Sequence, residues 1–587
     1  MTTVFGGYNH RLSCADGEFY DMKNMTTDYY PILSPRKKRA VSWEMNDSCT
    51  GMVSTNSGLY WMDGYYLYKN GKKIADRMIG TSYVYHSSMP KMGTSIVFAE
   101  DAFSSCAYNT DTGTIEGIQK LFSIGGAITL SPCKADGEII YASESENEPL
   151  DGEFRVAWVD GKRVFRQWSE STSTWLTISA TYVFINCFNS VGFKEGDCVK
   201  IEIDNSAGDF NDVLSLFPND EGDGRYSLES YIVSIPKSDQ GAELGFVIPG
   251  VIYTSFSTMK DFTISRVVPS MDFIVECDNR LWGVAWNGHE IYSCKLGDFN
   301  NWRVFRGIST DSYAVTIGSD GVFTGAITYL NTPIFFKENS MIRVYPSAVG
   351  AHQVKETRCR GLQWYSHKSL CVINEVLYYK SDDCICAFDG SLPVSISENF
   401  GEVRYDHAVA GTIGNKYYIS MYGDDGSGPH LFVYDVVKGL WTKEDDYAAT
   451  QFCRHDNDLY MVQKKDGKER VHTIRGTLPT EDATMEEDFE WYAESGMIGF
   501  ATPDNKYIGK ITVRLSMELG TNVDFYLQYD SSGTWEHIFN LSGTGTKSVN
   551  IPVLPRRCDH FRYKIAGKGD CKIFSITKTI EEGSDVR

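Results

Sequence analysis

A short pattern recurs along this chain at a nearly constant spacing. A polar turn containing Asn precedes a run of apolar and aromatic residues, as in Asn331-Thr332-Pro333-Ile334-Phe335-Phe336. A repeat of this kind is one supersecondary unit that cannot bury its apolar face alone, so it constrains the fold of the whole chain. The copies begin at Asn56, Asn279, Asn331, Asn374, Asn415 and Asn457, and the last four are separated by 43, 41 and 42 residues.

This period predicts the blades of a β-propeller. Four short strands joined by Gly, Asp and Asn turns fill about 42 residues, whereas an α-solenoid of similar period needs long helical stretches that the sequence lacks. Asn suits such turns because it tolerates the left-handed region, and the apolar residues after it supply buried inner strands. A degenerate copy at Ser95-Ile96-Val97-Phe98, with Ala107-Tyr108-Asn109, adds one blade. We expect about seven blades, two before a long insertion and five after it.

The remaining segments complete an all-β organisation. About 140 residues separate the second and third blades, and they include the alternating strand Cys198-Val199-Lys200-Ile201-Glu202-Ile203 after the turn at Phe193–Gly196. Beyond residue 480, alternating segments such as Ile511-Thr512-Val513-Arg514-Leu515 favour an antiparallel sandwich. We therefore expect an extended N-terminal arm over 1–48, propeller blades over 49–120, an inserted small β-barrel over 121–268, further blades over 269–480 and a C-terminal β-sandwich over 481–587.

The charge balance restricts the partners of the chain. Its 56 Lys and Arg against 77 Asp and Glu give a formal net charge of −21, which argues against a basic groove that binds nucleic acid by attraction. The 15 cysteines include no C-x-x-C pair, so we expect mostly buried thiols in a protein made in a reducing cytoplasm. The N-terminus does not have the pattern of a secretory signal and no apolar run reaches 18 residues, so no membrane insertion is expected.

A search for catalytic and metal-binding motifs leads to the expectation of no enzymatic activity, no cofactor and no metal. There is no H-E-x-x-H, no G-x-S-x-G and no P-loop. Asn219-Asp220-Glu221-Gly222-Asp223-Gly224 resembles the start of a calcium loop, but the twelfth position is Ser230 and not the Glu that such a loop requires. Asp530 with Ser531-Ser532-Gly533-Thr534-Trp535 resembles a single Asp-box turn, which is an element of fold.

One basic run contrasts with the acidic chain. Arg36, Lys37, Lys38 and Arg39 follow a segment with prolines at 31 and 35, which favour an extended path. Two interpretations are open: a solvated loop, or an arm that makes an inter-subunit contact with an acidic surface on a neighbouring copy. A second charged segment, 481–490, has six carboxylates in ten positions and reads as a solvated linker.

Three places in the chain carry a resemblance to a known family. The first is Asp21-Met22-Lys23-Asn24 followed by Tyr30-Pro31-Ile32-Leu33-Ser34-Pro35-Arg36, the second is Asn279-Arg280-Leu281-Trp282-Gly283 with Gly297-Asp298-Phe299-Asn300-Asn301-Trp302, and the third is Thr310-Asp311-Ser312-Tyr313 leading to Ile334–Ser340. Together they resemble the tail nozzle proteins of short-tailed phages, also called tail tubular protein B or packaged-DNA stabilisation protein. The likeness covers most of residues 1–480 and not the C-terminal part.

The resemblance implies a non-enzymatic structural protein of the virion tail, assembled in the host cytoplasm. Copies of the chain, typically six, would form a ring below the portal and adaptor that closes the DNA channel, retains the packaged genome and conducts it during ejection. The implied partners are the chain itself as a ring or hexamer, the portal and adaptor complex, tail fibres or a plug or needle protein, and DNA as passing cargo without specific binding. An acidic lumen would repel phosphates within about 8 Å, the Debye length at physiological salt.

Two alternatives belong to other classes. The abundance of aromatic residues, 13 % of the chain, is compatible with a glycan-binding or glycan-cleaving propeller that acts in host-surface recognition. An intracellular propeller that serves as a scaffold for peptide motifs is the other.

Overall fold

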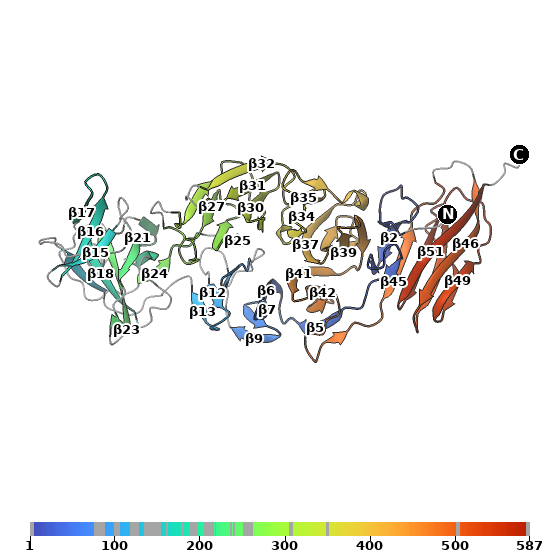
Figure 1. Cartoon of the computed structure of the whole chain (residues 1–587), viewed down its shortest axis with the longest axis horizontal. Helices are drawn as coiled ribbons and strands as arrows, with labels where there is room; N and C mark the ends of the chain where they lie inside the picture. Colours follow the sequence, from blue (N-terminus) through green and yellow to red (C-terminus); the bar gives the residue numbers. More distant parts are fainter. Residues whose placement is uncertain are drawn as a thin grey trace. The chain divides into compact units, whose positions relative to one another are not determined.

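The chain is all-β. In the computed structural model the described residues form many short strands and contain no α-helix (Figure 1). The short 3-10 helices η2 (His367–Ser369) and η3 (Glu398–Phe400) lie between strands. Among the residues that the structure describes, no helix is long and apolar enough to span a bilayer. The described residues are 5–75, 88–98, 106–117, 128–133, 154–159, 162–177, 180–187, 197–204, 217, 219–234, 237–238, 241–249, 262–269, 271–304, 309–347, 352–500 and 505–582.

Two compact units divide the chain. The first comprises Met1–Ile74, Phe336–Met341 and Thr357–Arg587, and the second comprises Ala75–Phe335 and Ile342–Glu356. Each unit is described by itself below.

Each copy of the sequence repeat is a small antiparallel sheet in which consecutive strands pair in order. The first sheet consists of β6 (Cys49–Thr55), β7 (Gly58–Asp63), β8 (Tyr66–Lys69) and β9 (Lys72–Ala75), and the second of β10 (Lys91–Met92), β11 (Ser95–Phe98), β12 (Cys106–Asn109) and β13 (Ile115–Gly117). The third consists of β25 (Phe273–Cys277), β26 (Arg280–Val284), β27 (Glu290–Ser293) and β28 (Tyr313–Thr316). The fourth consists of β29 (Gly325–Tyr329), β30 (Thr332–Lys337), β31 (Ser340–Tyr345) and β32 (Gln353–Arg358).

Three further sheets follow along the chain. The fifth sheet consists of β33 (Cys371–Ile373), β34 (Val376–Lys380), β35 (Ile385–Phe388) and β36 (Val394–Ser395). The sixth consists of β37 (Tyr405–Ile413), β38 (Lys416–Gly423), β39 (Gly428–Asp435) and β40 (Leu440–Lys443). The seventh consists of β41 (Ala448–His455), β42 (Asp458–Lys465) and β43 (Lys468–Thr473), together with β5 (Ala40–Glu44) and β44 (Thr484–Met485). The last of these sheets thus takes a strand from the beginning of the chain, because β5 pairs antiparallel with β43.

Three of the six repeated Asn residues, Asn279, Asn331 and Asn374, have the left-handed conformation that the sequence predicts, and Asn56, Asn415 and Asn457 do not. Asn279 and Asn331 have φ of 58° and 55°, and the preceding residues Asp278 and Leu330 also have positive φ, 52° and 47°. Two successive residues with positive φ form the tight type I′ hairpin turn, which matches the twist of the flanking strands. The strand after the turn is buried, completely so in β7 and β26. The predicted turns and buried inner strands are confirmed.

Neighbouring sheets share hydrophobic cores. In the first unit, Trp61 of β7 lies in one core with Val462 and Val471 of the last sheet, and Tyr418 of β38 lies in another with Met461 of β42. In the second unit, Val97 of β11 packs in a core with residues of β25 and β26, and a separate core joins that sheet to β30 and β31. These neighbouring sheets therefore pack against each other.

The C-terminal part of the first unit contains two sheets over one core that includes Val513, Phe525 and Ile565. One has the order β1 (Gly7–Tyr8), β2 (Glu18–Lys23), β45 (Glu490–Ser495), β50 (Phe561–Lys568), β47 (Asn522–Tyr529), β48 (Glu536–Ser542), and the other β49 (Gly545–Ile551), β46 (Lys506–Met517), β51 (Cys571–Glu582). A two-stranded sheet of β3 (Met25–Thr26) and β4 (Ser34–Pro35) lies in the same unit.

The N-terminal segment is extended, as expected, but it is not a separate arm. Its strand β2 pairs with β45, Leu33 forms a bridge with Ile573, and β5 belongs to the last repeated sheet. The segment 481–490 is mostly exposed, as expected of a solvated linker, but its middle forms the short strand β44, which pairs with the other edge of β5.

The insertion is described in part. Its strands are β14 (Ile128–Cys133), β15 (Phe154–Val159), β16 (Lys162–Ser169), β17 (Thr174–Thr177), β18 (Ala180–Cys187), β19 (Cys198–Asp204), β20 (Asn219–Gly222), β21 (Arg225–Ser234), β22 (Lys237–Ser238), β23 (Gly241–Pro249) and β24 (Phe262–Arg266). Three of them form a separate sheet, β15-β16-β17, and the others form an eight-stranded one. The predicted turn at Phe193–Gly196 lies outside the described residues. The run at 219–224 is the β20–β21 hairpin, where Glu221 pairs with Lys200 at 2.8 Å.

Asn301, in the second of the three segments that resemble the phage family, links the insertion to the sheet β25–β28. Asn301 donates from Nδ2 to Asp197 Oδ1 at 3.0 Å and accepts the N–H of Cys198 at 3.3 Å, so it holds the residues that start β19. Arg280 is buried and donates to the carbonyl oxygens of Ser309, Cys294 and Asp311. These motif residues are structural ones.

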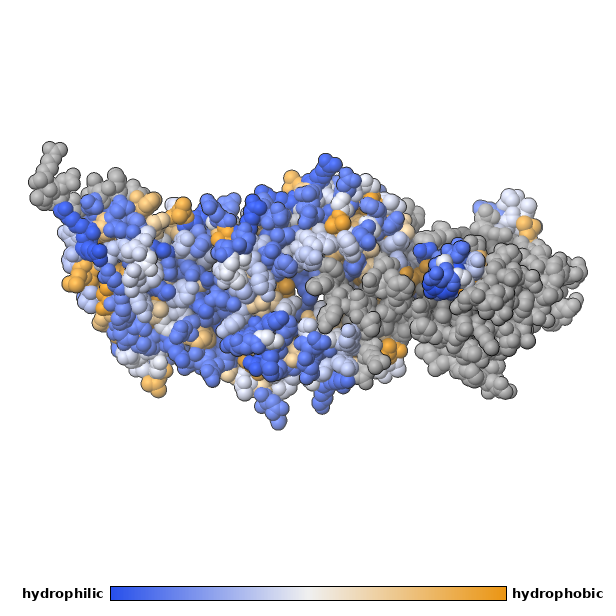
Figure 2. Space-filling model, turned by 180° about the vertical axis from the view of Figure 1, so that it is seen from behind, coloured by the Kyte–Doolittle hydropathy of each residue, from blue (hydrophilic) through white to orange (hydrophobic). Residues whose placement is uncertain are grey.

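The surface and the thiols agree with the composition. The described residues on the face drawn in Figure 2 are mostly hydrophilic, and apolar side chains form small, separate groups. Twelve described cysteines are free, and eight of them are buried.

Candidate contact site

The basic run lies where the N-terminal segment crosses the repeated sheets of the first unit. It begins after β4 and ends before β5, so its backbone is held at both sides. Arg36 and Arg39 are 7 % and 1 % exposed, whereas Lys37 and Lys38 are exposed. The run therefore presents two cations to the interior of the unit and two to solvent.

Arg39 is clamped between two consecutive carboxylates. Its NH2 group lies 2.5 Å from Glu444 Oε2 and its NH1 group 2.5 Å from Asp445 Oδ2. Gln463 of β42 adds a side-chain amide that donates to both oxygens of Asp445, at 3.0 and 3.1 Å. Each buried charge of this cluster thus faces an opposite charge, in an interior where unpaired charges are costly.

Arg36 connects the basic run to the acidic segment 481–490. Its guanidinium forms an ion pair with Glu486 and stacks 4.0 Å from the ring centroid of Phe489. Its Nε donates to Asn24 Oδ1 at 2.8 Å, and Asn24 in turn donates from Nδ2 to the carbonyl of Glu490. The run and the acidic segment, which the sequence presents as separate features, are parts of one contact.

The expected inter-subunit contact is therefore wrong for Arg36 and Arg39. Both guanidinium groups are buried and already neutralised within the same chain, so they are not accessible to a neighbouring copy. Lys38 pairs with Asp488 at 2.5 Å while its side chain stays 44 % exposed. For Lys37 and Lys38 the inter-subunit contact stays a prediction.

The positive charges of Arg36 and Arg39 contribute to lowering the pKa of Asp445 and of His472. Burial alone would raise the pKa of Asp445, but the charges of Arg39 and Arg36 hold it below its ordinary value. Burial, with the charge of Arg39 as the next cause, lowers the pKa of His472 to about 3. His472 of β43 is therefore neutral at physiological pH, and no described group hydrogen-bonds its Nδ1.

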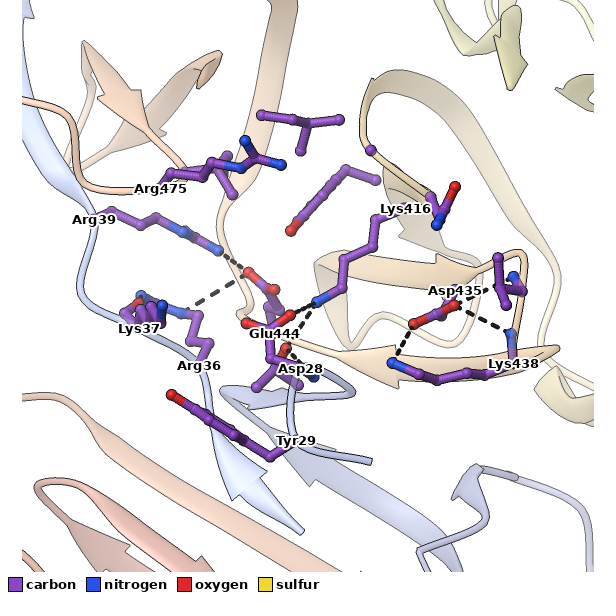
Figure 3. Close-up of a pocket in the computed structure, with 17 residues that line it drawn as sticks. Asp28, Tyr29, Arg36, Lys37, Arg39, Lys416, Asp435, Lys438, Glu444 and Arg475 are labelled. Atoms are coloured by element: carbon purple, nitrogen blue, oxygen red, sulfur yellow. Dashed lines mark hydrogen bonds and ion pairs between the residues drawn. The ribbon is translucent and has the colours of Figure 1, made fainter. Parts of the chain in front are cut away.

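A cavity of about 770 Å³ opens beside this cluster and is lined by residues of the N-terminal segment, β38, β39 and the loop after β43 (Figure 3). Cations exceed carboxylates in its lining, a reversal of the chain's overall charge. The cations are Arg36, Lys37, Arg39, Lys416, Lys438 and Arg475, and the carboxylates are Asp28, Asp435 and Glu444.

Several of these cations are engaged locally. Lys416 lies 2.6 Å from Asp28, and Lys438 lies 3.0 Å from Asp435, whose other contacts include the Thr27 hydroxyl at 2.8 Å. Arg475 donates to Asn457 Oδ1 at 2.9 Å and remains exposed. The cavity is thus a positively charged recess suited to carboxylate or other anionic groups.

The sequence gives no signal for most of this lining. Asp435 is the last residue of β39 and belongs to no site motif, and Glu444-Asp445 is a pair of acidic residues among 77. Among the residues that the structure describes, no group of three or more His, Cys, Asp or Glu side chains converges as a metal would require.

No protein-family model and no curated protein sequence matches this chain. Among solved structures it is similar to the β-propeller domain of Cps50 (Swd1) from Myceliophteria thermophila, at 8 % identity over 74 % of this chain and 99 % of that one, with a TM-score of 0.26. BamB from Moraxella catarrhalis is 14 % identical over 42 % and 84 %, with a TM-score of 0.22. An exo-β-1,3-galactanase from Phanerochaete chrysosporium is 7 % identical over 51 % and 95 %, with a TM-score of 0.21. Scores this low carry no weight for function.

Proposed function

We propose that the seven repeated sheets are the blades of one β-propeller, that the insertion is a small β-barrel and that the two C-terminal sheets form a β-sandwich. Antiparallel four-stranded sheets in sequential order are the units from which propellers are made. The shared cores of neighbouring sheets support this architecture. The pairing of β5 with β43 supports it too, because it joins the start of the series to its end.

We further propose that the protein is a structural component of a phage tail. In this role it forms the nozzle ring below portal and adaptor, closes the DNA channel, retains the packaged genome and conducts it during ejection. Tail fibres or a plug protein would contact the outer face of the ring.

One observation carries this proposal. Asn24 and Arg36, the end residues of the two N-terminal segments that resemble the nozzle family, bond directly to each other at 2.8 Å. Their contact fastens the N-terminal segment to the acidic segment before the C-terminal sheets. Residues that carry the resemblance to the nozzle family therefore contact each other, which supports the proposal.

The charge balance gives independent support. A conduit for DNA should not bind phosphates strongly, since every neutralised phosphate adds to an affinity that slows passage. The net charge of −21 meets that requirement. The local excess of cations in the 770 Å³ cavity is small and partly neutralised, so it favours single anionic side chains of a partner over a long polyanion.

Assembly with portal and adaptor tests the proposal. The full chain is co-expressed with those two proteins, and the complex is imaged by electron cryomicroscopy. We expect a ring of this chain at the distal end of the channel, six copies by the resemblance, and loss of packaged DNA from particles that lack it. A chain that stays monomeric with its partners and is absent from purified virions would contradict the proposal. Release of reducing ends from host-surface polysaccharide would favour the glycan alternative instead.

A further inference from the structure

Two loops at one end of the C-terminal sheets are tied together so that Ser531 faces His560. Asp530, directly after β47, accepts the N–H of Asp559 at 2.7 Å and that of His560 at 3.3 Å through Oδ1. The N–H of Asp530 donates back to the carbonyl of His560 at 3.0 Å. These three bonds fix the loop before β50 against the turn that carries Ser531.

The side chains then form a continuous hydrogen-bonded series. Ser531 Oγ lies 2.6 Å from His560 Nε2, and His560 Nδ1 lies 2.9 Å from Asp559 Oδ2. An ionised carboxylate only accepts, so Nδ1 carries the hydrogen, and the Nε2 of the neutral ring is left to accept the hydrogen of Ser531. The other acceptor near this hydroxyl, Met497 Sδ, lies 3.7 Å from Oγ and is a weak thioether acceptor, so it competes little with Nε2 at 2.6 Å. This is the arrangement in which a histidine activates a serine hydroxyl.

Packing fixes the ring and leaves the hydroxyl accessible. The side chain of His560 is 10 % exposed, and Phe500 lies against it edge-on, with ring centroids 5.4 Å apart. Ser531 itself is exposed, in a tight turn where Asp530 and Ser531 have φ of 49° and 47°. A serine presented on such a turn, beside an oriented base, has the geometry of a nucleophile.

A second Ser, His and Asp group in the same unit shows why this one is distinctive. Ser427 Oγ lies 2.8 Å from His430 Nε2, and His430 Nδ1 lies 2.9 Å from Asp446. However, Ser427 also lies 2.5 Å from Asp425 Oδ1, to which it must donate its single hydroxyl hydrogen. That hydrogen is therefore not directed at His430. The group at Ser427 has the same residue types without the activating bond.

We propose that Ser531, with His560 as general base and Asp559 as its positioning residue, is a nucleophilic site that cleaves small O-acyl esters, such as acetyl esters displayed on a macromolecular surface. Ser531 Oγ bonds to the acyl carbon while its proton moves to His560 Nε2. The ester C–O bond then breaks, and the leaving alkoxide takes that proton. Water, deprotonated by His560, releases the carboxylic acid and regenerates the hydroxyl.

The substrate class follows from the surroundings of the site. The turn is open to solvent, so it can reach an ester that another macromolecule presents. The side chain of Asp559 is 49 % exposed, and water competes for its bond to His560. We therefore expect acylation by reactive esters at a modest rate. This activity goes beyond the proposed tail role and does not depend on it.

The test uses the full-length protein with two probes, a fluorophosphonate and p-nitrophenyl acetate. The fluorophosphonate loses fluoride and leaves a phosphonyl group on the attacking oxygen, which peptide mass spectrometry locates. We expect labelling at Ser531 and none at Ser427, complete loss in Ser531→Ala, and a rate reduced about 100-fold or more in His560→Ala. Ser532→Ala and Ser427→Ala are the matched controls, which should label as the wild type does.

Two further readouts separate catalysis from a structural role. Added imidazole should restore part of the labelling in His560→Ala. Asp559→Asn should slow p-nitrophenyl acetate hydrolysis about tenfold, and Asp559→Glu should recover most of it, with unchanged melting temperatures throughout. Absent labelling at Ser531 in folded protein, or equal labelling of Ser427, would overturn the proposal.

Discussion

Arg36 and Glu486, 450 positions apart in the sequence, form an ion pair that joins the basic run to the acidic segment before the C-terminal sheets. Two oppositely charged segments with no common motif thus prove to be partners inside one chain. The pair lies beside the buried cluster of Arg39, Glu444 and Asp445, and together these charges hold the N-terminal segment in place.

Removal of the Arg39 guanidinium should be strongly destabilising. Arg39→Met leaves Glu444 and Asp445 buried without their counter-charge, a change that typically costs about 3–5 kcal/mol of unfolding free energy. Lys38→Met is the matched control, since its ion pair with Asp488 is solvent-exposed and contributes little to stability. Urea unfolding of both variants measures the difference. Equal losses of unfolding free energy in the two variants would contradict a larger contribution of the buried cluster.

Acidification should destabilise the first unit through His472. Its pKa is lowered to about 3 in the folded protein, against about 6.5 in an unfolded chain. The unfolded state therefore binds the additional proton as the pH falls below about 6.5, and stability present at pH 7 is lost progressively towards pH 3. At pH 5 this loss amounts to about 2 kcal/mol. His472→Leu should show a correspondingly smaller change in urea midpoint between pH 7 and pH 5, and an unchanged pH dependence would refute the assignment.

One turn should be open to improvement. Leu330 has a φ of 47° and is 59 % exposed, so its side chain contributes little while the left-handed backbone strains it. Leu330→Asn should raise the unfolding free energy by about 0.5–1 kcal/mol, because Asn tolerates this conformation. Leu392→Asn, at an equally exposed position without positive φ, serves as the control. A rise in melting temperature for both variants would point to surface polarity as the cause.

Gly361 should not accept a side chain. A Cβ atom there would lie 1.8 Å from the carbonyl oxygen of Lys337, which is backbone and cannot rotate away. Gly361→Ala should therefore cost about 3 kcal/mol or prevent folding. Gly318→Ala is the control, because a Cβ atom at that position meets nothing within 4 Å. Circular dichroism during heating compares the two, and near-equal melting temperatures would contradict the close approach.

Lys37 should matter for assembly and not for stability. It is exposed and lines the cationic cavity, so Lys37→Glu should weaken ring formation or partner binding at least tenfold without a change in unfolding free energy. Lys72→Glu, an exposed charge reversal on β9, controls for net charge. Sedimentation of the assembled complex is the measurement. Intact assembly with Lys37→Glu would remove the last basis for an inter-subunit role of the basic run.

Much of the local architecture was predictable because it repeats. The Asn-containing turns and the buried strands after them recur, so errors at one copy are corrected by the others, as at Asn279 and Asn331. No sequence pattern indicates the pairing of β5, near the start of the chain, with β43. Nothing in Ala40–Glu44 distinguishes a strand that completes the last repeated sheet from one that begins the first.

The site was less predictable than the fold. The basic run was visible, but its partners were not, because Glu444 and Glu486 are ordinary carboxylates until the fold places them beside Arg36. The sequence alone indicates only that Ser531 belongs to a turn. The residue that gives it chemical interest, His560, lies 29 positions away on another loop.

The position of β5 between β43 and β44 sets an order of events during synthesis. A ribosome releases residues 40–44 long before residues 468–485 exist, so the two edges of this strand must wait, unpaired, through the translation of more than four hundred residues. The first unit therefore reaches its final form only after nearly the whole polypeptide has emerged. A chain that ends before residue 468 lacks β43, β44 and β45, so one edge of β2 and both edges of β5 stay unpaired.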